Sequence, residues 1–420
     1  MLTIEQNDRI TRVGPSTPMG ELMRRYWHPI AAVSQMNDKA TKKIRLLGED
    51  LILYKDRSGA FGLIEPHCAH RRMNMIYGIP EESGLRCPYH GWLYDATGQC
   101  IEQPYEETED PDARFKDKIQ MKAYPVEEQA GLLMAYLGPQ PAPLRPAWDL
   151  FQMGDVVRDI GYAQVDCNYL QVMENSLDPI HVEWLHNYWA NYVMEQLGRD
   201  DLVGDRARHE KIHFERTNHG IVKRRVVVGG SEADDDWKVG HPIVFPNMLR
   251  QGTFSSRAGG GFQIRVPLDD YTTGHWWFRC YQMVEGDQPQ ASEHIPFYQV
   301  PVPQLDAEDR AEWEKLDNNS GQDLVAWVTQ GGIADREKEN LGRSDRGVIL
   351  YRQMLEENMQ IVADGGDPLN TFRDPATNEF HELPTESDAR FTKMGPARQR
   401  GGAATKYSPI MIEREGVVKY

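Results

Sequence analysis

The chain has 420 residues, of which 40% are hydrophobic and 26% charged, and its formal net charge is −17 at pH 7. This length is sufficient for two domains with separate cores, and the negative charge argues against nucleic acid and anionic membranes as partners. No run of about 18 apolar residues occurs, and the N-terminus lacks an apolar signal core, so no membrane segment and a cytoplasmic location are expected.

The first third of the chain has the pattern of a short helix followed by small strands. Thr17 before Pro18 predicts a helix start, and the amphipathic residues that follow predict a helix ending near residue 28. From Lys42 onward, strand-like runs alternate with turns, up to a hairpin over residues 124–138. Four prolines in residues 139–146 predict a linker. We therefore expect an N-terminal helical arm over residues 1–40 and a small antiparallel β domain over residues 41–150.

The remaining chain, residues 151–420, has the pattern of an α+β domain. Residues 168–192 are helical in composition, and two further helices are predicted near Asp323 and after Asp345. Strand-like runs lie between them, at residues 213–214, 221–228, 241–249, 261–268 and 275–281. This order predicts an antiparallel sheet with helices on one face, of the helix-grip type. The tail beyond residue 367 is polar and has no clear pattern.

Two short motifs in the first domain combine cysteine with histidine. Cys68 and His70 form a Cys-x-His pair, and Cys87 and His90 form a Cys-x-x-His pair. Two thiolates and two imidazoles can bind structural zinc or an iron–sulfur cluster. Three other cysteines remain, which is an odd number. A disulfide scaffold is therefore not expected, and a reducing compartment is expected. They are Cys100, Cys167 and Cys280.

The arrangement of these pairs favours a cluster over zinc. Common zinc motifs pair Cys with Cys and His with His, whereas here each segment supplies one of each. In a Rieske [2Fe–2S] centre, two histidines bind one iron and two cysteines the other, which suits mixed pairs. The runs CAHR and CPYHGWLYD closely resemble the Rieske signature of ring-hydroxylating oxygenases. The resemblance implies an all-β Rieske domain in which Cys68, His70, Cys87 and His90 hold the cluster.

A second candidate metal site lies in the run ENSLDPIHVEWLH, which begins at residue 174. Two histidines and one carboxylate form the facial triad of non-haem Fe(II) oxygenases, which leaves the other side of the iron open. His181 and His186 are five residues apart and do not share a face of a straight α-helix, so the helix must bend, bulge or end between them. The alternative is an ordinary amphipathic helix with two histidines on its polar face.

The pattern Asn-x-x-Asp-x-x-His-x-x-x-x-His resembles the mononuclear iron motif of Rieske oxygenases at every position. By this resemblance His181 and His186 are iron ligands. Asp178 is a catalytic carboxylate that bridges the two metal centres, and Asn175 supports it from outside the ligand set. In the family the bridge crosses a subunit interface, which implies contact between His90 and Asp178 of different chains. A homotrimer, or a multiple of one, is therefore expected.

The third iron ligand must be a carboxylate from another segment. Asp323, in the run GQDLVAWVTQGG, is the leading candidate, because relatives of phthalate dioxygenase carry the ligand in a similar Gln-Asp context. Asp317, Asp335 and Asp345 are the alternatives. The expected cofactors are one Rieske [2Fe–2S] cluster and one mononuclear non-haem Fe(II) per subunit.

The chain resembles the phthalate 4,5-dioxygenase branch along most of its length, as in GGIADREKENLGRSDRGV. That branch uses O₂ and a separate reductase, which carries flavin and a ferredoxin-type cluster, to cis-dihydroxylate an aromatic carboxylate such as phthalate. Arg208 and Arg250 are the candidates for binding the substrate carboxylate. The alternatives are O- or N-demethylation, diaryl-ether cleavage, a Rieske electron carrier without oxygenase activity and a zinc-stabilised binding module.

Overall fold

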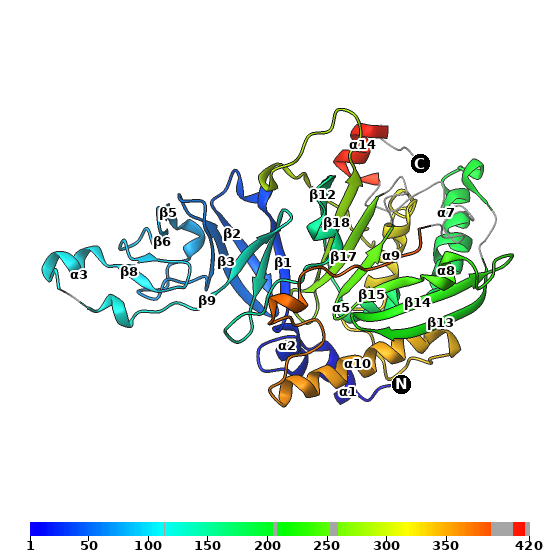
Figure 1. Cartoon of the computed structure of the whole chain (residues 1–420), viewed down its shortest axis with the longest axis horizontal. Helices are drawn as coiled ribbons and strands as arrows, with labels where there is room; N and C mark the ends of the chain where they lie inside the picture. Colours follow the sequence, from blue (N-terminus) through cyan, green and yellow to red (C-terminus); the bar gives the residue numbers. More distant parts are fainter. Residues whose placement is uncertain (113, 205–207, 253–258, 388–405, 416–420) are drawn as a thin grey trace.

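The chain forms an elongated molecule in which a small β domain projects from a larger α+β domain (Figure 1). The computed structural model describes residues 1–112, 114–204, 208–252, 259–387 and 406–415. The fold confirms the expected class, with an all-β N-terminal part and an antiparallel sheet with helices in the C-terminal part.

The N-terminal domain contains three small antiparallel sheets. The first has the order β1 (Trp27–Ala32), β11 (Leu132–Tyr136) and β10 (Val126–Gln129). The second has the order β2 (Thr41–Leu46), β3 (Glu49–Lys55), β4 (Phe61–Ile64) and β9 (Ala123–Tyr124). The third has the order β5 (Ile79–Glu81), β6 (Gly84–Arg86), β7 (Leu93–Tyr94) and β8 (Cys100–Glu102), and it lies at the free end of the molecule (Figure 1).

The N-terminal segment differs from the predicted arm. Two helices form, α1 (Ile4–Thr11) and α2 (Pro18–Met23), and the second ends several residues before residue 28. The next residues form β1, which pairs with β11. The expected helix was too long because Trp27 to Ala32 are all buried, and a strand that is covered on both faces has no polar side to reveal its period.

The C-terminal domain is organised around one eight-stranded sheet, antiparallel except where β12 meets β19. Its order is β13 (His209–Thr217), β14 (Gly220–Val227), β15 (His241–Val244), β16 (Met248–Gln251), β17 (Gly260–Pro267), β18 (Thr273–Gln282), β12 (Val156–Val165) and β19 (Phe297–Gln299). The central strand β18 is buried along nearly its whole length, consistent with coverage of both faces.

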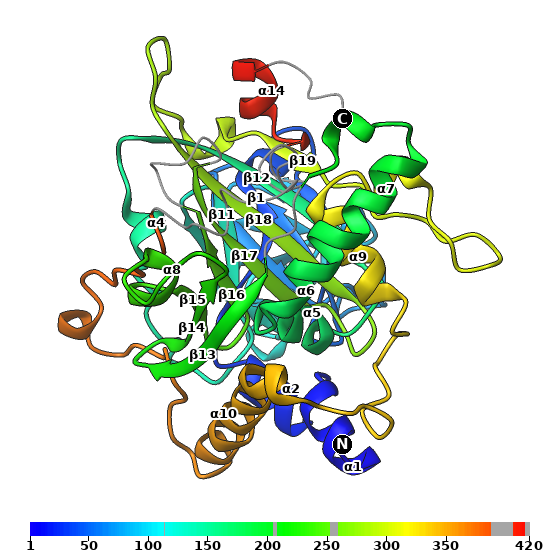
Figure 2. The same cartoon turned by 90° about the vertical axis from the view of Figure 1, so that its right-hand side faces the viewer.

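Helices cover one face of this sheet, as predicted. Figure 2 shows α5 (Tyr169–Ser176), α6 (Ile180–Glu183), α7 (Ala190–Gln196) and α9 (Asn319–Val328) in front of the sheet. The N-terminal domain covers the other face (Figure 1). The remaining described helices are α3 (Pro104–Glu109), α4 (Asp149–Gln152), α8 (Asp235–Lys238), α10 (Arg346–Ala363) and α14 (Pro409–Glu415). Among the described helices, none is long and apolar enough to cross a bilayer.

The helices that matter for the site are fixed by caps and by a small apolar core. Asn168 caps α5 by accepting from the Leu170 amide, and Asn318 caps α9 by accepting from the Gly321 amide. Between these helices and the sheet lies a buried cluster that includes Val172, Leu324 and Trp327 from the helices and Trp277 from β18. This layer holds the two helices in register with one another.

The two domains share a continuous hydrophobic core and direct hydrogen bonds. The turn after β2 donates from the Leu47 and Gly48 amides to the Pro267 and Leu268 carbonyls, at 3.1 and 2.8 Å. These contacts join the N-terminal domain to the face of the large sheet opposite the helices.

Candidate metal centres

The two Cys/His segments form loops with the same backbone hydrogen bonds. The Cys68 amide donates to the Met73 carbonyl at 2.9 Å, and the Cys87 amide donates to the Trp92 carbonyl at 2.8 Å. In each loop the amide four residues after the cysteine, in Arg72 and in Gly91, donates back to the cysteine carbonyl at 3.0 Å. Arg72 and Gly91 also share a positive φ, of 62° and 78°. Two similar loops thus face each other, which explains how each supplies one cysteine and one histidine.

The thiols and imidazoles are divided between the interior and the surface. Cys68 and Cys87 are buried, whereas His70 is half-buried and His90 is exposed. The two imidazole rings lie 4.4 Å apart between centroids, and His70 is stacked on Trp92 at 4.3 Å with an interplanar angle of 6°. A cluster held here would have its sulfur-bound side inside the domain and its imidazole-bound side at the surface.

Tyr94 provides a hydrogen bond to this group. Its hydroxyl lies 3.2 Å from the Cys68 sulfur, inside the domain. Hydrogen bonds to ligand sulfurs are one of the means by which a protein sets the reduction potential of a cluster. This contact could not be predicted from the sequence, because it depends on how β7 packs against the first loop.

A second group of side chains that could hold a metal comes from α6, the turn after it and α9, and we call these three residues the iron group. Donor atoms of His181, His186 and Asp323 all lie within 4.8 Å of one another. An Asp323 carboxylate oxygen is 3.1 Å from His186 Nε2 and 3.8 Å from His181 Nε2. Two imidazoles and one carboxylate, converging from one side, fit a divalent iron of the facial-triad type.

The predicted break in the helix is present. α5 ends at Ser176, and Asp178 accepts from the amides of Ile180 at 2.7 Å and His181 at 3.3 Å, which starts α6. The chain then forms a π-helical turn over Trp184–Trp189. In a straight α-helix, positions i and i+5 are about 140° apart around the axis. The wider π turn brings His186 to the side of His181, which confirms the predicted irregularity.

The side chains around this group fix its orientation. His186 Nδ1 lies 2.8 Å from Gln322 Oε1, which leaves Nε2 for a metal, and Gln322 in turn donates to the Leu316 carbonyl at 2.8 Å. Asn175 Nδ2 donates to Asp323 at 3.3 Å. His181 Nδ1 lies 3.6 Å from an Asp178 oxygen. Asp178 and Asn175 thus lie where the sequence pattern predicts them, next to the proposed ligands.

Electrostatics stabilises the ionised form of both aspartates. Burial would raise the pKa of Asp323, but His186, His181 and Asn175 outweigh it and hold the pKa below its usual value. Burial likewise opposes the lowering of the Asp178 pKa, which results from His181, the Ile180 amide and Lys223.

A buried charge network lies next to the iron group, on β13 to β15. Burial and the neighbouring Arg225 lower the pKa of Lys223 to about 7, and the Lys223 ammonium donates to the Ser176 carbonyl at 2.8 Å. Glu183 accepts from the His209 amide at 2.9 Å. The network therefore anchors both α5 and α6 to the sheet.

The structure does not bring the two predicted arginines to the iron group. Arg208 is exposed just before β13. Arg250 is buried opposite Phe262, and its guanidinium lies 3.6 Å from an Asp149 oxygen. The next residue of β17, Gln263, pairs with Trp277, which packs against α9, so Phe262 and Arg250 lie on the sheet face away from the helices.

A buried arginine on the helix-covered face is Arg265, which sequence reasoning missed. It pairs across the sheet with His275, whose ring stacks on Trp327 of α9 at 5.4 Å. Arg265 is 1% exposed and bonds to Gln263, and within the described part of the chain no carboxylate forms an ion pair with it. Burial lowers its pKa to about 9, against the opposing attraction of Asp323.

The alternative carboxylates are engaged elsewhere. Asp317 binds Lys406 and Asn318. Asp335 pairs with Lys338 at 2.8 Å, and Asp345 accepts from the Gly342 amide at 2.6 Å. Among the four candidates, Asp323 is the one grouped with the two histidines.

Comparisons with known proteins assign the family. A model of the Rieske [2Fe-2S] domain matches residues 26–125. The chain is 43% identical over 387 residues to the 5,5'-dehydrodivanillate O-demethylase oxygenase subunit of Sphingobium sp. strain SYK-6, covering 92% of this chain and 87% of that protein. The chain belongs to the Rieske non-haem iron oxygenases.

A further relative and a solved structure are also similar to this chain. The phthalate 4,5-dioxygenase oxygenase subunit of Pseudomonas putida is 28% identical over 403 residues, covering 88% of this chain and 89% of that protein. The terminal oxygenase of carbazole 1,9a-dioxygenase from Novosphingobium sp. KA1 has the same fold, with a TM-score of 0.58 and 18% identity over 83% of this chain and 96% of that one. The cofactors of this oxygenase are therefore a Rieske [2Fe–2S] cluster and a mononuclear non-haem iron.

Proposed function

We propose that this Rieske oxygenase removes a methyl group from a methoxylated aromatic carboxylate. The observation that carries the proposal is the 43% identity to an O-demethylase subunit along 92% of the chain. O-demethylation was an alternative in the sequence-based prediction, where cis-dihydroxylation came first.

His181, His186 and Asp323 would hold the iron, and Cys68, His70, Cys87 and His90 would hold the cluster. When bound, the iron supplies the activation of O₂. The protein's task is to position the substrate, exclude water and deliver electrons. Three ligands from one side leave space on the other for oxygen and substrate. Gln322 and Asn175 keep two of these ligands in orientation by the hydrogen bonds described above.

The reaction needs reducing equivalents from another protein. One O₂, two electrons and two protons convert an aryl methyl ether into a phenol, formaldehyde and water. One oxygen atom is inserted into a methyl C–H bond, and the resulting hemiacetal releases formaldehyde. The other oxygen atom becomes water. A separate reductase, with flavin and a ferredoxin-type cluster, is the expected electron source.

We propose that electrons pass between subunits. Within one chain, the sheet β5 to β8 lies at the opposite end of the molecule from α5, α7 and α9 (Figure 1). His90 is exposed at that end, and Asp178 lies beside His181 at the other. A neighbour's His90 placed against Asp178 would give a short hydrogen-bonded route from cluster to iron.

Exposed aromatic side chains at both ends support this contact. Tyr77, Tyr89 and Tyr105 are 71%, 51% and 71% exposed in the cluster-binding domain. Trp184 and Tyr188, in the π turn that carries His186, are 50% and 60% exposed. Large exposed aromatics are typical of protein interfaces. Two different surfaces that meet head to tail generate a ring when the rotation closes, in accord with the expected homotrimer or a multiple of it.

Carboxylate recognition would involve Arg265. A buried guanidinium with no ion-pair partner among the described residues would be stabilised by an anionic substrate group. Arg208 and Arg250 remain sequence-based candidates, although Arg250 already faces Asp149.

The test is turnover with the purified oxygenase, a phthalate-family reductase and NADH. The substrates are methoxybenzoates, phenoxybenzoates and phthalates. Formaldehyde released in equal amount to the phenol, with substrate-dependent O₂ uptake, is the expected result. No formaldehyde from any methoxylated acid would refute demethylation.

The second candidate is cis-dihydroxylation of an aromatic carboxylate, favoured by the 28% identity to phthalate 4,5-dioxygenase over 88% of the chain. A dihydrodiol that carries both atoms of ¹⁸O₂ would identify it.

A further inference from the structure

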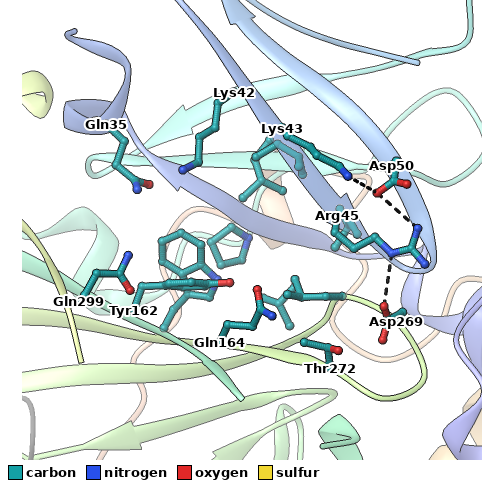
Figure 3. Close-up of a pocket in the computed structure, with 17 residues that line it drawn as sticks. Gln35, Lys42, Lys43, Arg45, Asp50, Tyr162, Gln164, Asp269, Thr272 and Gln299 are labelled. Carbon is teal, nitrogen blue, oxygen red and sulfur yellow. Dashed lines mark hydrogen bonds and ion pairs between the residues drawn. The ribbon is translucent and has the colours of Figure 1, made fainter. Parts of the chain in front are cut away.

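A pocket of about 520 Å³ lies between the two domains (Figure 3). One wall comes from β2 of the N-terminal domain, and the other from β12, β17, β18 and β19 of the large sheet. Its aromatic floor is Tyr162 and Trp276, which face each other across β12 and β18. Trp276 belongs to the core shared with the N-terminal domain, whereas its neighbour Trp277 packs against the helix-covered face. The pocket is therefore on the sheet face opposite the iron.

The three cations of β2 that line the pocket differ in their partners. Lys43 lies 3.7 Å from Asp50, and Arg45 lies 3.4 Å from both Asp50 and Asp269. Lys42 is half-buried and has no ion-pair partner within the described ranges of the chain. Figure 3 shows Lys42 reaching into the pocket, while Lys43 and Arg45 turn toward Asp50. A partly desolvated cation of this kind favours an anion beside it.

The rest of the pocket offers ring contacts and hydrogen-bond donors. The rings of Tyr162 and Trp276 lie 4.6 Å apart between centroids. Trp276 is 3% exposed, and its indole N–H is buried without a hydrogen-bond partner among the described residues. The pocket also contains three amide side chains, Gln35, Gln164 and Gln299 (Figure 3).

We propose that this pocket binds a small aromatic monocarboxylate as a second ligand, away from the iron. The Lys42 ammonium can pair with one carboxylate, and the rings of Tyr162 and Trp276 can contact one planar ring. The volume lies within the range of about 300–1,000 Å³ that is usual for small-molecule sites. Because its walls come from both domains, the bound acid would bridge them and stabilise their packing. The proposal rests on the pocket alone and does not depend on which reaction the iron supports.

The test is calorimetric titration of the holoenzyme with benzoate, with benzamide and cyclohexanecarboxylate as probes that lack the charge or the ring. Wild type is expected to bind benzoate saturably and each of the other two at least tenfold more weakly. Lys42→Met is expected to weaken this benzoate binding at least tenfold, while demethylation in the absence of benzoate stays unchanged. Lys43→Met, which removes the neighbouring paired cation, should bind benzoate within twofold of wild type.

Three results would overturn the proposal. They are no benzoate binding at millimolar concentration, equal binding by Lys42→Met and wild type, or equal losses in Lys42→Met and Lys43→Met. Equal losses in both variants would indicate that general surface charge attracts benzoate. Equal binding by Lys42→Met and wild type would show that benzoate binds elsewhere, for example at the iron site. Binding that depends on Lys42 would stand even if no methoxylated acid released formaldehyde.

Discussion

The two metal regions are assembled in different ways. The four proposed cluster ligands come from two loops within residues 67–95, whose backbones repeat the same hydrogen bonds. The iron group comes from α6, the following π turn and the distant helix α9, and it forms only when both helices pack on the large sheet. The first site is thus a local property of the chain, and the second is a property of the whole C-terminal domain. Substitutions near the iron should therefore act through orientation and charge, with the cluster left intact.

The largest loss of turnover with an unchanged cluster is expected for Asp178→Asn. The side-chain oxygen of the introduced residue can still accept a hydrogen bond from the Ile180 backbone amide and start α6. The negative charge beside His181 is lost. The Rieske absorption and the iron content should remain normal, whereas product formation should fall by about 100-fold or more, as when a positioned catalytic group is lost.

Asp335→Asn is the matched control, because this exposed carboxylate pairs with Lys338 away from the iron group. Steady-state turnover and the rate of cluster re-oxidation with substrate and O₂ are the measurements. If turnover of Asp178→Asn matched wild type, the bridge would not carry the electron.

A smaller effect, on iron affinity, is expected for Gln322→Ala. This change removes the partner of His186 Nδ1, so the imidazole loses its fixed orientation. Loss of such a partner typically lowers metal affinity by about 10- to 100-fold. Iron retained after dialysis against a chelator should fall accordingly, with an unchanged cluster signal. Gln330→Ala, whose amide donates to the Ala326 carbonyl at the exposed end of α9, should retain iron like wild type.

The contrast also explains what the sequence could reveal. The cluster ligands lie in two short contiguous motifs, and a break near Pro179 followed by an i, i+5 histidine pair already required an irregular helix. Asp323 was reachable through its Gln-Asp context. The substrate arginines were harder, because strand periodicity tells which residues alternate but not which face the helices cover. Arg250 lies on the face toward the N-terminal domain and Arg265 on the other, a distinction set by tertiary packing.

Recognition of the substrate carboxylate by an arginine can be tested with three arginine-to-glutamine variants. Arg265→Gln should raise KM for a carboxylated substrate about tenfold, equivalent to about 1.4 kcal/mol, with little change in kcat. Arg208→Gln, at an exposed position, should leave KM unchanged. Arg250→Gln leaves Asp149 buried and unpaired, so its main effect should be on stability, with a loss of about 3–5 kcal/mol in the free energy of unfolding. A raised KM for Arg208→Gln or Arg250→Gln alone would restore the sequence-based candidates.

The smallest effect should appear at the cluster itself, with Tyr94→Phe. The hydroxyl near the Cys68 sulfur stabilises the reduced cluster more than the oxidised one, because the reduced cluster carries more negative charge. A hydrogen bond contributes about 0.5–1.5 kcal/mol, and for one electron 1.4 kcal/mol corresponds to about 59 mV. The reduction potential should therefore fall by about 20–60 mV, measured by redox titration of the Rieske signal. Tyr105→Phe, exposed in the same domain, should leave the potential unchanged. Iron content should be normal in both variants, because neither tyrosine lies in the domain that contains the iron group. An unshifted potential in Tyr94→Phe would show that the phenol does not donate to the ligand sulfur.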